Sequence, residues 1–195
     1  MLRELRPSLR MLAVLTLLTG IVYPSFVALV ARVAFAHAAG GSLIVDGGRV
    51  VGSEHLGQAF ADSGRFWSRP SATGVPYDAS ASTGSNLGPL NADLFAAIRA
   101  RVAALRAADP GNAAPVPADL VTASASGLDP DISPAAARYQ AARIARVRGL
   151  SPARVHTLIA AHLEGRTFGV LGEERVNVLE LNRALDQAAP RGASR

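Results

Sequence analysis

Hydrophobic residues form one long uninterrupted run near the beginning of the chain, whereas further along they recur at the spacings of helices and strands. The run, residues 11–31, contains no charged side chain. Its 21 residues extend about 30 Å as an α-helix, which matches the hydrocarbon core of a bilayer. The pattern predicts a single transmembrane helix, which we place at residues 11–36.

The charges around this run predict its orientation in the membrane. Three arginines and one acid, Glu4, precede the run, whereas a single basic residue, Arg32, follows it closely. Basic flanks remain on the cytoplasmic side of a membrane. We therefore predict a cytoplasmic segment at residues 1–10 and an extracytoplasmic domain at residues 37–195.

A cleaved signal sequence is the alternative interpretation of the same run. Ala34-Phe35-Ala36 has the small-x-small form of a signal peptidase site, and the segment before the run is basic. However, the hydrophobic part of a signal sequence is typically about 7–15 residues long, and Arg32 interrupts the approach to this site. These features favour a retained anchor, and either interpretation places residues 37–195 in the same compartment.

Small residues and a proline inside the run predict a surface for packing against other helices. Thr16 and Gly20 lie four residues apart on one helix face, where small side chains let a second helix approach closely. Pro24 lacks a backbone donor and therefore predicts a kink. The candidate packing residues are Thr16, Gly20, Tyr23 and Pro24. A kinked but solitary anchor is the alternative.

The remaining chain mixes patterns typical of strands and of helices, which predicts one α/β (α+β) domain. Two apolar runs around Asp46-Gly47-Gly48 predict a β-hairpin at residues 43–51 that covers a core. Residues 66–89 form a long irregular segment, and residues 116–123 predict a short extended run at a sheet edge. Helix N-caps are predicted at Asn91, Ser133, Ser151 and Asn177. The helix after Asn91 has an apolar stripe at Leu94, Ile98, Val102 and Leu105.

Composition excludes several kinds of chemistry. The chain has no Cys, so it contains neither a disulfide nor a thiolate nucleophile. All 20 basic residues are Arg, and residues 37–195 have 16 of them against 14 acids, a net charge of only +2. Because there is no basic stripe and no aromatic RNA-binding motif, the sequence predicts no nucleic-acid partner.

Three short motifs invite a catalytic or ligand-binding interpretation. Ser126 lacks the Gly-x-Ser-x-Gly motif of a nucleophile, and no histidine is placed as its base. Asp129 and Asp131 lack the rest of a calcium-binding loop. Ser82–Gly88 places small hydrogen-bonding residues just before a helix, where backbone donors bind anions, but a capped turn explains the same residues. The sequence therefore predicts no catalytic residue and no metal ligand.

Seven segments occur in a fixed order along the chain: residues 19–24 (TGIVYP), 52–58 (GSEHLGQ), 66–72 (FWSRPSA), 84–89 (GSNLGP), 119–124 (DLVTAS), 129–130 (DP) and 175–182 (RVNVLELN). This ordered set resembles the KdpC family, the small subunit of the bacterial potassium-importing KdpFABC ATPase. The resemblance extends from about Leu9 to Asp186. His55, Thr83 and Asp131 depart from the common pattern of the family.

The resemblance implies an accessory role without turnover of its own. In this family KdpA translocates potassium and KdpB hydrolyses ATP, whereas KdpC is described as a stabilising subunit and a catalytic chaperone that raises the affinity of KdpB for ATP. The implied partners are KdpA, KdpB, KdpF and the lipid of a bacterial inner membrane. The chain is expected to have no cofactor of its own, apart from ATP shared with KdpB.

The predicted topology conflicts with direct contact between this chain and ATP. An extracytoplasmic domain cannot contact ATP held by a cytoplasmic domain, so we expect the domain to lie over the potassium entrance of KdpA. The alternative is a nucleotide-binding module that forms a ternary complex with KdpB and ATP, with Arg69 or Arg138 supplying positive charge. Its candidate residues are Arg69, Ser82, Gly84, Ser85, Asn86 and Gly88.

Overall fold

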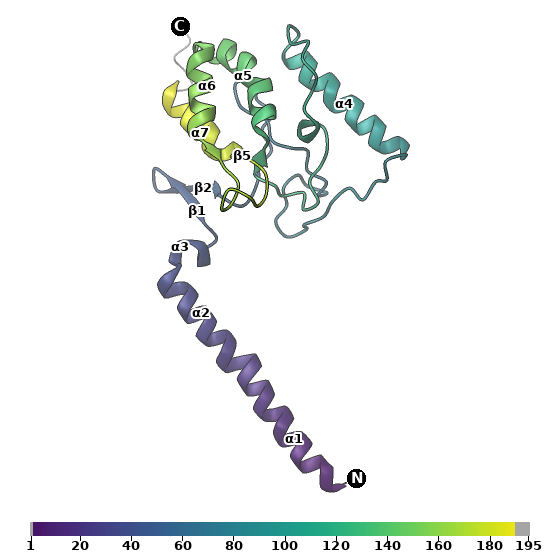
Figure 1. Cartoon of the computed structure of the whole chain (residues 1–195), viewed down its shortest axis with the longest axis vertical. Helices are drawn as coiled ribbons and strands as arrows, with labels where there is room; N and C mark the ends of the chain where they lie inside the picture. Colours follow the sequence, from purple (N-terminus) through teal and green to yellow (C-terminus); the bar gives the residue numbers. More distant parts are fainter. Residues whose placement is uncertain (1, 190–195) are drawn as a thin grey trace. The chain divides into compact units, whose positions relative to one another are not determined.

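The structure, a computed structural model, describes residues 2–189 (Figure 1). Contacts between residues divide the chain into two units, Met1–Val50 and Val51–Arg195. The first unit is dominated by one long helix, and the second combines helices with a small antiparallel sheet. The predicted class, one N-terminal apolar helix followed by a mixed helix and sheet domain, is confirmed.

The long helix of the first unit is continuous over three elements, α1 (Leu2–Leu17), η1 (Leu18–Val22) and α2 (Tyr23–Ala34). Residues Arg3–Ala34 are long and apolar enough to cross a membrane. The helix therefore begins well before the apolar run, inside the basic segment at residues 1–10. A four-residue helix, α3 (Ala36–Ala39), follows it.

The element η1 is a π-helical turn, and Pro24 accounts for its position. Pro24 has no N–H, so the carbonyl of Gly20 lacks the donor that an α-helix would supply four residues later. The chain widens just before this point, where the N–H of Tyr23 donates to the oxygen of Leu18, five residues back. Where the sequence predicts a kink, the structure therefore has a π-helical turn on the N-terminal side of Pro24.

The predicted hairpin forms from β1 (Leu43–Asp46) and β2 (Arg49–Ser53). Gly47 and Gly48 join the strands with φ values of 55° and 80°, the left-handed region that this kind of turn needs. Of the hairpin's large apolar side chains only Ile44 is buried. The expectation that the apolar residues of the hairpin jointly cover a core is therefore wrong.

The core of the second unit lies between three helices and a three-stranded sheet. The helices lie together in Figure 1, coloured green to yellow. The antiparallel strands have the order β3-β5-β4, and Val176 of the central strand pairs with Ile132 on one side and Leu163 on the other. The elements are β3 (Asp131–Ile132), α5 (Pro134–Arg148), α6 (Pro152–Ala161), β4 (Leu163–Glu164), β5 (Arg175–Asn177) and α7 (Val178–Ala188). The residues of this core that are most completely buried include Ile144, Val155, Val176, Leu181 and Leu185.

All four predicted N-caps are confirmed. The side chains of Asn91, Ser133, Ser151 and Asn177 each accept a hydrogen bond from a backbone N–H in the first turn of their helix. Helix α5 ends at Gly149, which has a φ of 65° and lies in the left-handed conformation typical of a helix C-terminus. Local chemistry therefore sets the bounds of these helices.

Helix α4 (Ala92–Ala108, teal in Figure 1) stands apart from the three core helices. Of its predicted apolar stripe only Leu105 is buried, and the other three side chains are half-buried. The run at residues 116–123 is not extended, because it contains a 3₁₀ turn, η2 (Ala118–Leu120). The predicted edge strand is therefore wrong, and the carboxylate of Asp119 in this turn binds Ser133 instead.

Two buried side-chain amides hold the irregular chain at Phe66 and Trp67. Asn182 of α7 accepts the N–H of Phe66 at 2.8 Å and donates to its carbonyl at 3.0 Å. Gln140 of α5 accepts the N–H of Trp67 at 2.8 Å and donates to its carbonyl at 3.1 Å. Each amide therefore replaces the backbone partner that a neighbouring strand would supply.

A buried arginine completes this anchorage. Arg143 of α5 donates to the carbonyls of Ser63 and Arg65 and to the amide oxygen of Gln140. Its guanidinium also lies 4.8 Å from the centre of the Trp67 ring. Burial lowers the pKa of Arg143 to about 10, so the side chain remains charged at neutral pH.

Candidate functional site

The four candidate membrane residues lie around the π-helical turn. Thr16 is in α1, Gly20 in η1, and Tyr23 and Pro24 begin α2. All four are exposed, as are the large apolar side chains of this helix from Leu5 to Val33. A Cβ added at Gly20 would meet nothing within 4 Å. This face is therefore open to lipid or to another helix.

The candidate loop Ser82–Gly88 lies against a second irregular segment, residues 124–127. The hydroxyl of Ser82 and the N–H of Thr83 both donate to the carbonyl of Ser126, at 3.1 Å and 2.9 Å. Gly84 packs closely on Ala125, and a Cβ there would lie 3.0 Å from the Ala125 oxygen. The first half of the loop is therefore committed to contacts within the chain.

The second half of the loop leads into α4. Ser85, Asn86 and Gly88 are exposed, and Asn86 has a φ of 51°, in the left-handed region. The carbonyl of Gly88 accepts the N–H of Asn91, which caps the helix. This arrangement confirms a capped turn. It leaves the prediction of nucleotide binding untested.

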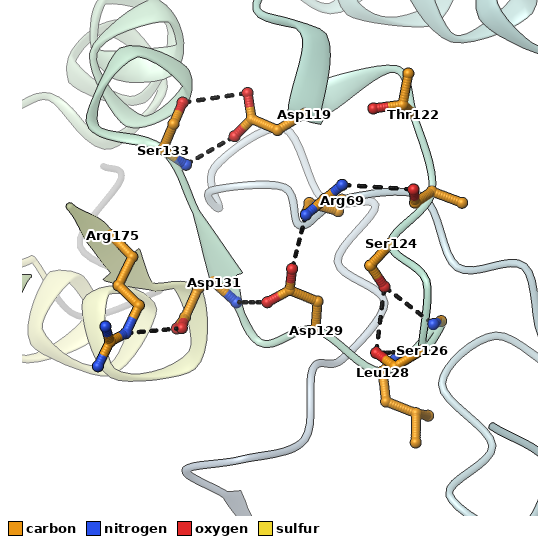
Figure 2. Close-up of polar contacts among 12 residues, drawn as sticks. Arg69, Asp119, Thr122, Ser124, Ser126, Leu128, Asp129, Asp131, Ser133 and Arg175 are labelled. Carbon is orange, nitrogen blue, oxygen red and sulfur yellow. Dashed lines mark hydrogen bonds and ion pairs between the residues drawn. The ribbon is translucent and has the colours of Figure 1, made fainter. Parts of the chain in front are cut away.

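Arg69 is held by an acidic group of the segment before β3 (Figure 2). Its Nη1 lies 2.8 Å from Oδ2 of Asp129, and its Nη2 donates to the carbonyl of Ala123 at 3.4 Å. Oδ1 of Asp129 also accepts the N–H of Asp131 at 3.1 Å. Asp129 therefore largely neutralises the positive charge of Arg69. Arg138, the other candidate arginine, is exposed on α5.

Two further ion pairs, both made by Arg175, join the strands of the sheet. Arg175 of β5 contacts Asp131 of β3 at 3.2 Å and Glu164 of β4 at 2.6 Å, so one guanidinium bridges both outer strands. Burial, and next the charges of Asp129 and Glu164, raise the pKa of Asp131 to about 6, against the opposing effects of Arg175 and His55. Asp131 therefore changes its charge near neutral pH.

Sequence comparison identifies relatives over nearly the whole length of the chain. The family model described as KdpC, K+-transporting ATPase, c chain, matches residues 5–187. The potassium-transporting ATPase KdpC subunit of Variovorax paradoxus is 61% identical over 95% of this chain and 96% of its own. The KdpC subunits of Polaromonas naphthalenivorans and Sorangium cellulosum are 62% and 61% identical, over 95% and 96% of this chain and 95% and 100% of their own.

The chain belongs to the KdpC family. The resemblance carried by the seven ordered segments is therefore confirmed. KdpC relatives are named as subunits of a potassium-transporting ATPase, which implies an accessory role in potassium transport for this chain.

Ser124 and Ser126 of this KdpC chain accept hydrogen bonds from nearby backbone N–H groups. Oγ of Ser124 accepts the N–H of Gly127 at 2.9 Å, and Oγ of Ser126 accepts the N–H of Leu128 at 3.1 Å (Figure 2). Within residues 2–189 no group of three or more His, Cys, Asp or Glu side chains is arranged to hold a metal ion. Ser124 and Ser126 therefore stabilise a turn of the chain through their hydroxyl groups.

A cavity of about 370 Å³ lies between α4 and the loops beside it, and sequence reasoning did not find it. Ser85 and Leu87 of the candidate loop line it, together with the apolar side of α4. Arg101 is the charged residue in this lining; it donates to the carbonyls of Ser68 and Leu120 and lies 6.0 Å from the Trp67 ring. Burial lowers the pKa of Arg101. The sequence feature that could have indicated this cavity is Arg101, a charged residue next to Val102 of the predicted apolar stripe.

Proposed function

We propose that this chain is the accessory subunit of a high-affinity, ATP-driven potassium importer, and that it stabilises the complex and raises the ATP affinity of KdpB. The observation that carries the proposal is the helix Arg3–Ala34, whose large apolar side chains are exposed along its length, in a chain of the KdpC family. Such a helix is stable only where lipid or other helices cover it. An inner-membrane complex with KdpA, KdpB and KdpF supplies both.

The packing face of this helix is assigned to Thr16, Gly20, Tyr23 and Pro24. Gly20 lies in the π-helical turn and has nothing near its missing Cβ, so a partner helix can approach the backbone there. We expect KdpA or KdpB to contribute that helix. The domain that follows then lies outside the cell, over the potassium entrance of KdpA.

Replacing Gly20 with leucine tests the packing face. The chain itself leaves room for the new side chain, so Gly20→Leu will keep its helix but will not copurify with KdpA and KdpB in detergent. Ser25→Leu is the control, because Ser25 lies about 100° of helix rotation past Pro24 within α2 and therefore adds the same bulk away from this face. Normal copurification of Gly20→Leu would show that the packing face is wrong.

Orientation is tested by labelling the chain in intact cells. The chain has no Cys, so single cysteines at Ser8 and at exposed Ala160 of α6 react independently with an impermeant maleimide. Labelling at Ala160→Cys alone is expected. Labelling at Ser8→Cys alone would show that the topology is the reverse of the predicted one, with the domain on the side of the membrane where ATP is held.

The chaperone role follows from this orientation as an indirect effect. The membrane helix is the part of the chain that can transmit a change to KdpB. We expect the Michaelis constant of the complex for ATP to rise when the chain is removed, while the catalytic residues of KdpB remain intact. An unchanged Michaelis constant would reduce the role of the chain to holding the complex together.

Direct nucleotide binding at Ser82–Gly88 is the second candidate. The cavity beside Ser85, with Arg101 in its lining, favours it, although Arg101 alone provides little charge for a triphosphate and Arg69 is paired with Asp129. Trp67 is the single Trp of the chain and lies beside Arg101, so its fluorescence reports on this cavity. Titration of the full chain with ATP in detergent will leave the fluorescence unchanged unless this candidate is correct.

A further inference from the structure

The loop between β4 and β5 exposes three large apolar side chains at its tip. Phe168 is 90% exposed, Val170 71% and Leu171 59%. We call these three residues the apolar tip. Single exposed apolar residues are ordinary in proteins, but three within four positions form a local patch of the kind used for binding.

Hydrogen bonds within the loop hold the apolar tip in one conformation. Thr167 and Leu171 exchange backbone hydrogen bonds of 2.9 Å and 3.0 Å. The N–H of Gly169 donates to Arg166 at 2.9 Å, and the N–H of Val170 donates to Thr167 at 3.2 Å. The loop is therefore ordered before it meets a partner, which lowers the entropic cost of binding.

Phe168 has a backbone conformation that its side chain does not favour. Its φ is +54°, a region where Gly or Asn is expected and where a bulky residue is strained. An aromatic ring that is 90% exposed gains little from packing within the chain. The advantage of Phe at this position therefore lies in contact with another molecule.

The charges around the base of the loop identify the kind of partner. Arg166 is paired with Glu173 at 2.6 Å, and Arg175 is engaged by Glu164 and Asp131. Within residues 2–189 Glu174 has no ion pair, so the base of the loop has an excess of negative charge. Anionic lipid headgroups would repel such a base, whereas a basic rim on a protein would attract it.

We propose that the apolar tip inserts into an apolar, basic-rimmed pocket on another subunit of the ATPase. The inference rests on the proposed function, because it requires that the chain assembles with other subunits. The ordered apolar tip fills the pocket, and the acidic residues where the loop leaves the sheet match the basic rim around it.

Phe168→Gly tests the tip in the purified complex. Glycine adopts the φ of this position without strain, so the variant keeps or gains stability while it loses the ring. Dissociation from a tagged partner subunit in detergent should become about tenfold faster or more, as for an aromatic anchor. Leu90→Gly is the matched control, because Leu90 is 91% exposed outside this loop. Phe168→Asn, which also tolerates this φ, should repeat the effect.

Crosslinking identifies the occupant of the tip. A benzophenone amino acid at position 168 should crosslink to another subunit of the purified complex, and the same group at position 90 should not. Glu174→Arg should weaken retention, and less so at high salt. Crosslinks only to lipid or to a second copy, or equal dissociation of Phe168→Gly and Leu90→Gly, would overturn the proposal. If the wild-type chain itself does not copurify, the proposed function fails as well.

Discussion

Replacing Asn182 with alanine removes the side chain that pairs with the backbone of Phe66. Phe66 and Asn182 are both 0% exposed, so water cannot replace the lost partner. One N–H and one carbonyl are left unsatisfied, and each buried group of this kind costs about 1–3 kcal/mol. We therefore expect the free energy of unfolding to fall by about 3 kcal/mol, a large part of the stability of a typical domain.

Urea denaturation of the full chain in detergent micelles measures this loss. Trp67 follows Phe66 directly and is the single Trp, so its fluorescence reports on the segment that Asn182 holds. Asn91→Ala is the matched control, because Asn91 also accepts one backbone N–H but at an exposed helix start. Loss of such a cap costs about 1 kcal/mol.

The comparison between these two variants decides the outcome. If Asn182→Ala destabilises the chain no more than Asn91→Ala does, the buried amide does not hold Phe66, and the reasoning about this segment is refuted. A loss reported by Trp67 fluorescence but absent from far-UV circular dichroism would mean that the segment detaches without unfolding of the helices.

Two further predictions concern the packing and titration of the second unit. The pKa of Asp131 is raised to about 6, so its ionisation weakens folding above that pH and the penalty disappears as the pH falls towards its unfolded value of 3.8. Asp131→Asn should therefore raise the urea midpoint at pH 8 and change it little at pH 4, because the raised pKa already includes the opposing effect of Arg175. A lower midpoint of Asp131→Asn at pH 8 would contradict this reasoning. Gly127 has a φ of 69°, and a Cβ there would lie 2.6 Å from the oxygen of Thr83. Gly127→Ala should lower the melting temperature by several degrees, whereas Gly88→Ala, with nothing within 4 Å, should not; equal melting temperatures would contradict the close packing.

The parts of the fold that depend on neighbouring residues could be predicted from the sequence. The membrane-length helix, the Asp-Gly-Gly turn and the four N-caps are set by interactions within a few residues. The strands β3 and β4 have only two residues each, too few to show a period-two pattern. Three of the four stripe residues on α4 are only half-buried, because this helix stands apart from the three core helices.

The polar residues that organise the second unit could not be predicted in the same way. Gln140 and Asn182 bind backbone groups 73 and 116 residues away, and no local pattern distinguishes them from exposed amides. Arg143 is one of four arginines in α5, and nothing in their spacing distinguishes it from the exposed ones. The candidate loop was located correctly before α4, but its pairing with residues 124–127 depends on a long-range contact.

The anchorage of Phe66 and Trp67 by Gln140 and Asn182 has a consequence for the order of folding. The irregular segment leaves the ribosome early, but its partners belong to helices that are synthesised 73 and 116 residues later. Closing loops of this length is slow compared with forming a helix. The segment therefore reaches its final path only after α7 has been made, so a chain that ends before Asn182 would leave it without its closing contact.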